Sequence, residues 1–266
     1  MSPKSSSPKN RSPENMSLES KRVLITGGSG ELGSRIALLL DAEGAKVTVM
    51  DRQPPRNLPV DFLRCDLASA EGLEEAALQL DDRPVDILVN LAGVQHFGPV
   101  ESQTPAHLQT TYMVNLVAPV RLTQAVLPGM RARGSGQIVN VGSIFGSINF
   151  AHFATYSSSK AGLRGFSQAL RREVAGSGID VTYIAPRAVK TGFNSPKVLE
   201  FAARTKMAMD DPDKIAGRIV ESIAGRRGDV YLGFPEAVFV RLNALAPGLV
   251  DRALAAGDRE VAKLFA

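Results

Sequence analysis

A tyrosine and a lysine four residues apart, Tyr156 and Lys160, are the side chains whose spacing most directly suggests proton chemistry. Positions i and i+4 lie on one face of a helix, so the lysine ammonium would stand near the phenol and favour its ionised form. This matters because an unperturbed tyrosine, with a pKa near about 10, is a weak base at neutral pH. Ser143, upstream at the end of an apolar run, could orient a substrate carbonyl or alcohol. A Tyr-x-x-x-Lys pair alone is more often a surface pair, so its surroundings decide its meaning.

A glycine-rich turn near the N-terminus could hold phosphate groups. Gly27, Gly30 and Gly33 directly follow an apolar run and lead into an apolar helical segment. In such a turn the first glycine permits the tight bend, the second lets the backbone approach a pyrophosphate, and the third lets the helix pack on the sheet. Backbone N–H groups at the helix N-terminus would then face the phosphate charge. Because a glycine triplet alone also fits a flexible turn, the interpretation needs a second signal.

That second signal is Asp51, which ends the next apolar run about twenty residues later. A carboxylate there can accept both hydroxyls of an adenosine ribose and would repel a 2′-phosphate. We therefore expect NAD(H) as the cofactor, with NADP(H) as the alternative because Arg52 could instead hold a 2′-phosphate. Asp66, followed by Leu67, ends a third run and could contact the adenine ring or cap the next helix.

Short apolar runs alternate with amphipathic segments from residue 21 onward, which predicts parallel strands joined by helices. The runs lack polar alternation, as is typical of strands buried on both faces. With no internal repeat and no long linker, the pattern predicts a single-domain α/β Rossmann fold, a doubly wound parallel β-sheet with helices on both faces. Ligands of such sheets bind at the carboxyl ends of the strands. The predicted strands are Arg22–Thr26, Lys46–Met50, Asp61–Cys65, Asp86–Asn90, Gln137–Val141, Asp180–Ile184 and Val230–Leu232.

The composition excludes several classes of protein. The 266 residues are 44% hydrophobic and 22% charged, and a net charge of +4 gives little reason to expect a nucleic-acid partner. Cys65 is the only cysteine, so we expect no internal disulfide and a reducing, cytoplasmic location. No segment resembles a membrane span, and no metal-ligand spacing occurs. We expect a disordered Ser/Pro/Lys-rich tail over 1–20, the Rossmann domain over 21–233 and a C-terminal amphipathic helical extension over 234–266.

Taken together, these motifs resemble the short-chain dehydrogenase/reductase family over residues 22–232. The resemblance implies a catalytic tetrad of Asn115, Ser143, Tyr156 and Lys160, present here in the family's order. It implies an NAD(P)-dependent oxidoreductase that interconverts a secondary alcohol and a ketone, with hydride moving to or from the nicotinamide while Tyr156 exchanges a proton with the substrate oxygen. Ser143 would hold that oxygen, Lys160 would bind the nicotinamide ribose and lower the tyrosine pKa, and Asn115 would position a water. A homodimer or homotetramer is expected.

The chain departs from the family's pattern at Glu31, Leu91 and Arg187. Glu31 takes the place of the middle glycine in the phosphate turn, so we expect a working turn with a locally different backbone. Leu91 replaces a structural asparagine, which should affect stability more than activity. Arg187 replaces a glycine and could face the cofactor phosphates, the substrate mouth or solvent. The expected cofactor-binding residues are Gly27, Ser29, Gly30, Glu31, Leu32, Gly33, Asp51, Arg52, Asp66, Leu67, Asn90, Ala92, Gly93, Tyr156, Lys160, Pro186, Val189 and Thr191.

By the same resemblance, the substrate pocket should be walled by residues 94–97, 144–153 and 193–209, which follow the fourth, fifth and sixth predicted strands. These segments are strongly apolar, so we expect a small apolar alcohol or ketone, such as a lipid, an acyl chain or a steroid-like molecule. Each of their large apolar side chains could equally pack in the core. The expected substrate-pocket residues are Gln95, His96, Ser143, Phe145, Phe150, Phe153, Arg187 and Phe193.

The C-terminal extension carries apolar residues at helical spacing, interrupted at Pro247. It could pack on its own domain or on a sister subunit, cover the pocket, or make a peripheral membrane contact. An alternative function is a catalytically silent dinucleotide-binding regulator or scaffold, for which Glu31 and Leu91 are the hints and the intact tetrad is the counter-argument. Dehydration or epimerisation would need an extra carboxylate beside Ser143, which the sequence lacks.

Overall fold

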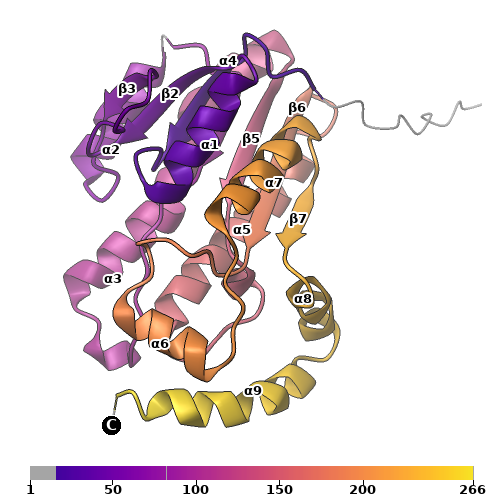
Figure 1. The fold of residues 1–266 in the computed structure, drawn as a ribbon. Coiled ribbons are helices and arrows are strands. Elements are labelled where there is room, and N and C mark those ends of the chain that lie inside the picture. The colour runs from indigo at the N-terminus through magenta and orange to yellow at the C-terminus, as the bar shows by residue number, and fades with distance from the viewer. Residues whose placement is uncertain (1–15, 82, 266) are drawn as a thin grey trace, which may run out of the picture.

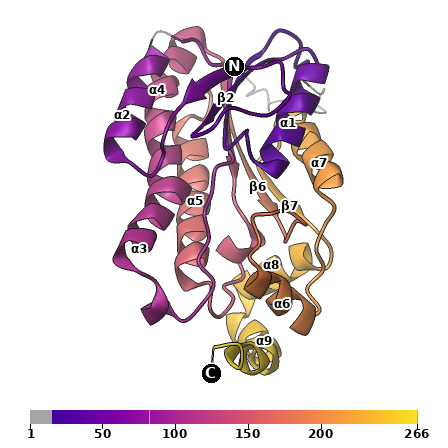
Figure 2. The same ribbon diagram turned by 60° about the vertical axis from the view of Figure 1, so that its left-hand side comes forward.

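In the part of the chain that the structure describes, seven parallel strands form one sheet, with helices on both of its faces (Figures 1 and 2). This computed structural model describes residues 16–81 and 83–265. Neighbouring strands follow the order β3-β2-β1-β4-β5-β6-β7, which confirms the predicted doubly wound Rossmann sheet. The strands are β1 (Arg22–Thr26), β2 (Lys46–Asp51), β3 (Asp61–Arg64), β4 (Ile87–Asn90), β5 (Gly136–Val141), β6 (Ile179–Pro186) and β7 (Asp229–Leu232).

Two helical layers bury the apolar strands from opposite sides. Helices α1 and α7 place Ile36 and Ile219 in the core on one face, whereas α2, α4 and α5 place Leu73, Leu122 and Leu170 on the other. The helices are α1 (Glu31–Ala42), α2 (Ala70–Asp81), α3 (Pro105–Tyr112), α4 (Ala118–Arg133), α5 (Ala154–Glu173), α6 (Pro196–Arg204), α7 (Pro212–Ala224), α8 (Glu236–Leu245) and α9 (Pro247–Ala262), with short turns η1 (Val100–Ser102), η2 (Met113–Val117) and η3 (Ile144–Gly146).

Several helices begin at a polar cap followed by proline. Thr104, Ser195 and Asp211 each accept a hydrogen bond from a backbone N–H of the first turn of α3, α6 and α7, respectively. A proline follows each of these caps. Its missing N–H removes no hydrogen bond, because the N–H groups of the first helical turn have no partner within the helix. These local signals fix the starts of α6 and α7, which flank the predicted site.

The order of the strands reverses between β1 and β4, and the loops after these strands diverge there. Thr26 at the end of β1 pairs in register with Asn90 at the end of β4. Its hydroxyl oxygen accepts hydrogen bonds from the backbone N–H groups of Leu91 and Ala92, both at 3.1 Å. The side chain of Leu91 packs against the α1–α7 core. This apolar contact and the hydrogen bonds to Thr26 hold the loop at the position where the family has an asparagine.

The expected tail of residues 1–20 is wrong for residues 16–20, and residues 1–15 lie outside the described residues. The backbone N–H of Met16 donates to the carbonyl of Ala224 at 2.9 Å. Leu18 is 4% exposed and belongs to the α1–α7 core. Burial of the apolar Leu18 side chain therefore anchors this otherwise polar segment against α7.

The C-terminal extension forms α8 and α9, and both pack on their own domain (Figure 1). Val240 and Val250 pack with Ile148, and Val261 packs in the cluster that contains Phe201 of α6. Pro247 begins α9 instead of kinking a longer helix, as its missing N–H allows. No helix among the described residues is long and apolar enough to cross a membrane.

Candidate active site

A cavity of about 500 Å³ lies at the carboxyl ends of the strands. The loops that follow β1 to β6 and the helix α6 form its wall, at the edge where the strand order reverses. The predicted site residues that line it are Gly27, Gly30, Glu31, Leu32, Gly33, Asp51, Arg52, Asp66, Leu67, Ala92, Gly93, Gln95, Ser143, Phe145, Phe153, Tyr156, Lys160, Pro186, Arg187, Val189, Thr191 and Phe193.

Ser29, Asn90 and Asn115 are absent from this wall. The backbone N–H of Ser29 donates to Asp51 at 3.1 Å, so Ser29 supports the wall from outside. The side-chain amide of Asn90 donates to Asn140 at 2.8 Å inside the sheet. Asn90 therefore braces β4 against β5 instead of facing the cavity.

His96 and Phe150 also lie outside the cavity wall. The His96 ring stacks edge-on against His107, with ring centres 5.5 Å apart, and its Nε2 lies 3.4 Å from the carbonyl oxygen of Pro99. Phe150 stacks behind Phe145, with ring centres 4.6 Å apart. Phe150 therefore backs the pocket as a second layer, and His96 belongs to the surface beside it.

The cavity wall also contains residues that were not named one by one as expected site residues. Those numbered 94 and 194–209 lie inside the segments 94–97 and 193–209 that were expected to wall the pocket, and most of the others are neighbours of expected residues in the same loops. Thr110 and Val114 come from α3 and η2, and no local signal marks them. The additional wall residues are Cys65, Ala68, Leu91, Val94, Thr110, Val114, Val141, Gly142, Ala188, Gly192, Asn194, Val198, Phe201, Ala202, Met207 and Met209.

Tyr156 and Lys160 lie one turn apart on α5 and are 8% and 3% exposed. Burial raises the pKa of Tyr156 to about 12, although a hydrogen bond with the Ser143 side chain acts to lower it. Burial also lowers the pKa of Lys160 to about 8. The Lys160 Nζ lies 5.9 Å from the centre of the tyrosine ring. The expected lowering of the tyrosine pKa by Lys160 is therefore wrong for this structure, because burial of the phenol dominates.

Backbone contacts hold the serine and the lysine in place. The Lys160 Nζ donates to the carbonyl oxygen of Val141 at 3.1 Å, which ties the ammonium to the end of β5. Two residues later Ser143 caps the turn η3, where its Oγ accepts from the N–H of Phe145 at 3.1 Å. Strand β5 therefore sets the positions of both groups relative to Tyr156.

Asn115 is fully buried in the π-helical turn η2, between α3 and α4. Its Oδ1 accepts from the N–H of Val94 at 2.9 Å, and its Nδ2 donates to the carbonyl of Val94 at 2.8 Å and to Ser159 Oγ at 3.0 Å. Both amide donors are committed, so the side chain ties the loop after β4 to α5 and does not present an amide proton to a water. A π-helical turn of this kind is frequent at functional sites.

The turn after β1 has the shape that a pyrophosphate needs. Gly27 has a φ of +70°, and a Cβ there would stand 2.8 Å from the Cα of Ala92, so no side chain fits. Gly30, the N-cap residue before α1, provides no side-chain cap. The first N–H groups of the helix are then available to an anion. The residues present fit a nicotinamide dinucleotide, with Glu31 as the departure.

Acidic residues stand at the expected adenosine end. The Asp51 carboxylate accepts from the N–H groups of Ser29 and Arg52 at 3.1 and 2.7 Å. Asp66 caps its own turn by accepting from the N–H of Ala68 at 3.0 Å. Beside them burial, and secondarily the nearby carboxylates, raises the pKa of the Cys65 thiol to about 11. Among residues 16–81 and 83–265 no group of three His, Cys, Asp or Glu could hold a metal ion.

Arg187 is bound by acidic side chains of its own chain. Its guanidinium donates to both oxygens of Asp210 at 2.8 and 2.7 Å, and Nη1 contacts the Glu236 carboxylate at 3.1 Å. It also donates to the carbonyl of Phe234 at 3.2 Å. Arg187 lines the cavity, as expected for a residue at the substrate mouth, and its guanidinium ties β6 to the loop before α7 and to α8.

The end of the cavity beyond Tyr156 is apolar. Phe145, Phe153 and Phe201 line it, and Phe97 stacks behind Phe153 with ring centres 4.6 Å apart. The extension reaches this wall, because Phe265 lies 5.1 Å from Phe97, ring centre to ring centre. The aromatic wall therefore depends on the C-terminal residues that follow α9.

The chain is similar to reductases of known activity. It is 29% identical to the ketoacyl reductase HetN of Nostoc sp., with 91% of this chain and 85% of the relative covered. It is 32% identical to the 3-oxoacyl-acyl-carrier-protein reductase FabG of Vibrio cholerae, with 84% and 93% covered.

Solved structures share the fold, and two of the three described here hold a nicotinamide dinucleotide. A short-chain dehydrogenase from Streptomyces avermitilis has a TM-score of 0.75 at 29% identity, with 92% of this chain and 99% of that chain covered. One from Sphingobium yanoikuyae, in complex with NADPH, has a TM-score of 0.74 at 25% identity, with 87% and 95% covered. One from Leptospira borgpetersenii, with bound NAD+, has a TM-score of 0.70 at 25% identity, with 87% and 98% covered.

The family pattern described as short chain dehydrogenase matches residues 21–200, which hold the glycine turn, Ser143 and the Tyr156–Lys160 pair. The fold and the two reductase relatives agree with that match. The chain therefore belongs to the short-chain dehydrogenase/reductase family, oxidoreductases that act on CH–OH groups.

Proposed function

We propose that this protein interconverts a secondary alcohol and a ketone of apolar character, with Tyr156 as the general acid and base. One observation carries the proposal: Tyr156, Ser143 and Lys160 line the same cavity as the glycine turn, and its far wall is aromatic. A bound nicotinamide dinucleotide would supply or accept the hydride. The protein's own task is then to bind the substrate oxygen and to move one proton.

The proton step follows from the protonation states of the buried pair. With a pKa of about 12, Tyr156 keeps its proton at neutral pH and can donate it to a substrate oxygen. Ser143 lies close enough to hydrogen-bond with the tyrosine and can hold the same oxygen. For alcohol oxidation the proton moves in the opposite direction, and Lys160 would supply the positive charge that this step needs.

The side chains of the cavity wall indicate the class of substrate, because they are aromatic and offer no free positive charge from Arg187. Phe145, Phe153 and Phe201 offer apolar surface to a guest. The positive charge of Arg187 is balanced by Asp210 and Glu236, which leaves it poorly suited to bind a substrate carboxylate. A medium-chain or ring ketone therefore suits the pocket better than a polyol or an acid.

The proposal favours NAD(H) over NADP(H). Related structures hold NADPH and NAD+, so the family allows both. Here the Asp51 carboxylate lies at the cavity wall, where it would repel a 2′-phosphate. Arg52 lines the same end and keeps NADP(H) as the alternative.

We also propose that the protein forms a homodimer or homotetramer in the cytoplasm. Its C-terminal extension would make a peripheral contact with a membrane. Phe234 and Leu245 are 78% and 85% exposed, which supports a contact surface there. Exposed Arg241 on the same extension would suit anionic lipid headgroups. Light scattering measures the oligomeric mass, and flotation with anionic vesicles measures the membrane contact.

Replacement of Tyr156 by phenylalanine tests the proton step. We expect Tyr156→Phe to reduce medium-chain ketones about 10²- to 10⁴-fold more slowly, because the ring remains but the transferable proton is gone. NADH affinity, followed by fluorescence, should stay near the wild-type value. Turnover is read from the nicotinamide absorbance over a panel of ketones and alcohols of increasing chain length.

The matched control is Tyr112→Phe, which removes an exposed hydroxyl that contacts Ser158 Oγ at 2.7 Å. This variant should retain activity. Wild-type turnover in Tyr156→Phe would contradict the mechanism, and a wild-type preference for sugars over ketones would contradict the apolar substrate class.

Removal of the Asp51 charge tests the cofactor preference. We expect Asp51→Asn to narrow the ratio of NADPH to NADH dissociation constants by about 5- to 10-fold, since one close unit charge contributes roughly 1 kcal/mol even in water. Paired fluorescence titrations measure the ratio. Asp61→Asn, an exposed carboxylate at the start of β3, is the control. An unchanged ratio in Asp51→Asn would mean that this carboxylate does not face the adenosine ribose.

The buried ammonium of Lys160 should lower the stability of the fold. Its folded pKa of about 8 lies below the ordinary value of 10.5, so between these values the unfolded chain binds more protons. The contribution of this group to the free energy of unfolding is therefore unfavourable below about pH 8 and is relieved as the pH rises to about 10.5.

We expect Lys160→Met to be more stable than the wild type by roughly 1–3 kcal/mol at neutral pH, with a gain that shrinks toward about pH 10. Urea unfolding at both pH values measures the difference, and Lys214→Met, an exposed lysine of α7, should show no such trend. A destabilised Lys160→Met protein at neutral pH would show that the ammonium is well solvated by the fold.

A further inference from the structure

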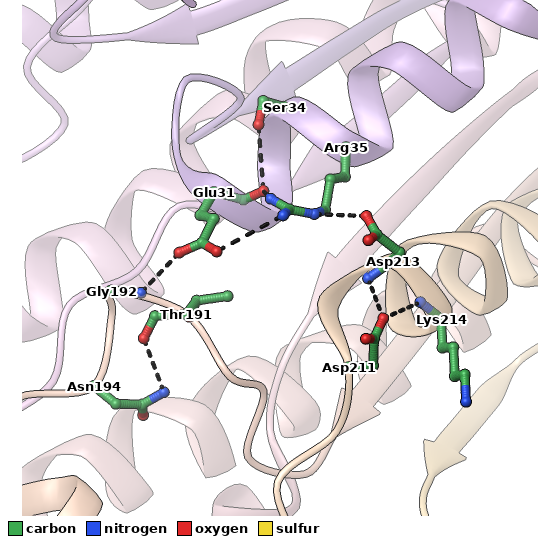
Figure 3. A network of polar contacts seen from close by, with 9 residues as sticks. All are labelled: Glu31, Ser34, Arg35, Thr191, Gly192, Asn194, Asp211, Asp213 and Lys214. Atoms are coloured by element: carbon green, nitrogen blue, oxygen red, sulfur yellow. Dashed lines mark hydrogen bonds and ion pairs between the residues drawn. The ribbon is translucent and has the colours of Figure 1, made fainter.

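The side chain of Glu31 reaches from the glycine turn to the loop after β6 (Figure 3). Its Oε2 accepts a hydrogen bond from the backbone N–H of Gly192 at 2.9 Å. Both residues line the cavity. Glu31 is the first residue of α1, where the family's pattern has a glycine and no side chain could reach across. The departure noted in the sequence therefore creates a contact between two walls of the same site.

Arg35, one turn along α1, reinforces this contact. Its Nη1 donates to the backbone carbonyl of Glu31 at 2.7 Å, and its Nη2 lies 3.8 Å from the Glu31 carboxylate. Its Nε contacts Asp213 of α7 at 2.7 Å. Figure 3 shows both contacts, one from Glu31 to Gly192 in the loop after β6 and one from Arg35 to Asp213 in the first turn of α7.

Glu31 contacts the segment formed by residues 190–210, several of which line the cavity. The two ends of this segment meet at the base, where the N–H of Lys190 donates to the carbonyl of Asp210 at 2.9 Å and the N–H of Asp210 donates to the carbonyl of Ala188 at 2.8 Å. Between these ends lie Phe193 and Phe201, which face the cavity. A contact at Gly192 therefore controls how closely this segment approaches the glycine turn.

Glu31 is an acidic residue in the first turn of α1. The N-terminus of a helix attracts negative charge through its unpaired N–H groups and its dipole. Glu31 supplies one negative charge there from within the chain. A dinucleotide brings phosphate charge to the same helix end, so the two anions repel each other.

We propose that Glu31 is a clamp: its carboxylate holds the 190–210 segment against the glycine turn and competes with the phosphates of the dinucleotide for the N-terminus of α1. Dinucleotide binding then displaces the carboxylate and frees Gly192. The inference rests on the proposed function, because it takes a dinucleotide to be the ligand. It makes Glu31 a positioning residue that sets cofactor affinity and couples it to the substrate wall.

Two substitutions separate the charge from the hydrogen bond. Glu31→Gln loses the charge but keeps an oxygen that can accept from Gly192, whereas Glu31→Ala loses both. We expect both variants of the full chain to bind NADH and ADP about 3- to 10-fold more tightly than the wild type, and adenosine, which has no phosphate, equally well. The gain of Glu31→Gln should fall as salt is added.

Hydrogen exchange gives a readout that does not depend on turnover. Without added dinucleotide, the Gly192 amide should exchange faster in Glu31→Ala and near the wild-type rate in Glu31→Gln. Added NADH should speed this amide in the wild type, as the carboxylate is displaced. Glu43→Gln, an exposed carboxylate at the far end of α1, is the matched control and should change neither measurement.

Wild-type or weaker ADP affinity in both Glu31 variants, in a protein that binds NADH, would overturn the clamp and leave the proposed function standing. Gly192 exchange that is equal in the wild type and Glu31→Ala would overturn the holding role of the carboxylate. If the wild type and the variants all fail to bind NADH and NADPH, the proposed function itself is wrong and the clamp with it.

Discussion

Burial of a parallel sheet on both faces determines where this protein can bind a ligand. Helices α1 and α7 cover one face and α2, α4 and α5 cover the other, so the ends of the strands are left for polar chemistry, and ligands of such sheets bind at the carboxyl ends. The loops after β1 to β6 converge there, and the strand reversal between β1 and β4 separates them enough to open a cavity. The glycine turn, the acidic adenosine end and the Tyr156–Lys160 pair meet at one edge for this reason.

The same burial sets the protonation of Tyr156 and Lys160, the proposed catalytic pair. Desolvation raises the pKa of Tyr156 and lowers that of Lys160, so both groups are driven toward their neutral forms. A neutral phenol is a proton donor, and a lysine with a pKa near 8 still carries its charge at neutral pH. The fold therefore keeps a poorly solvated ammonium at the site, held by Val141, where a substrate and a cofactor would use it.

The local motifs could be predicted from the sequence, and the long-range contacts could not. Gly27, Ser143, Tyr156 and the seven strands are marked by neighbouring residues, because turns, strand ends and helix faces have short periods. The partners of Arg187 come from a loop and from α8, and the partner of Glu31 lies 161 positions away in the sequence. Packing decides such pairings, as it decides the anchoring of Leu18. The hydrogen bonds between Asn115 and Val94 depend on a π-helical turn, and no residue pattern in the sequence predicts that turn.

In the proposed reaction, hydride passes from the reduced nicotinamide to the carbonyl carbon of an apolar ketone bound beside Tyr156. Isotope transfer tests this step: the protein is incubated with a medium-chain ketone and reduced dinucleotide that carries deuterium at both hydrogens of nicotinamide C4, and the alcohol is analysed by mass spectrometry. We expect an alcohol that carries one deuterium on its carbinol carbon. Alcohol without the label, or no alcohol from any ketone by a protein that binds the dinucleotide, would contradict it.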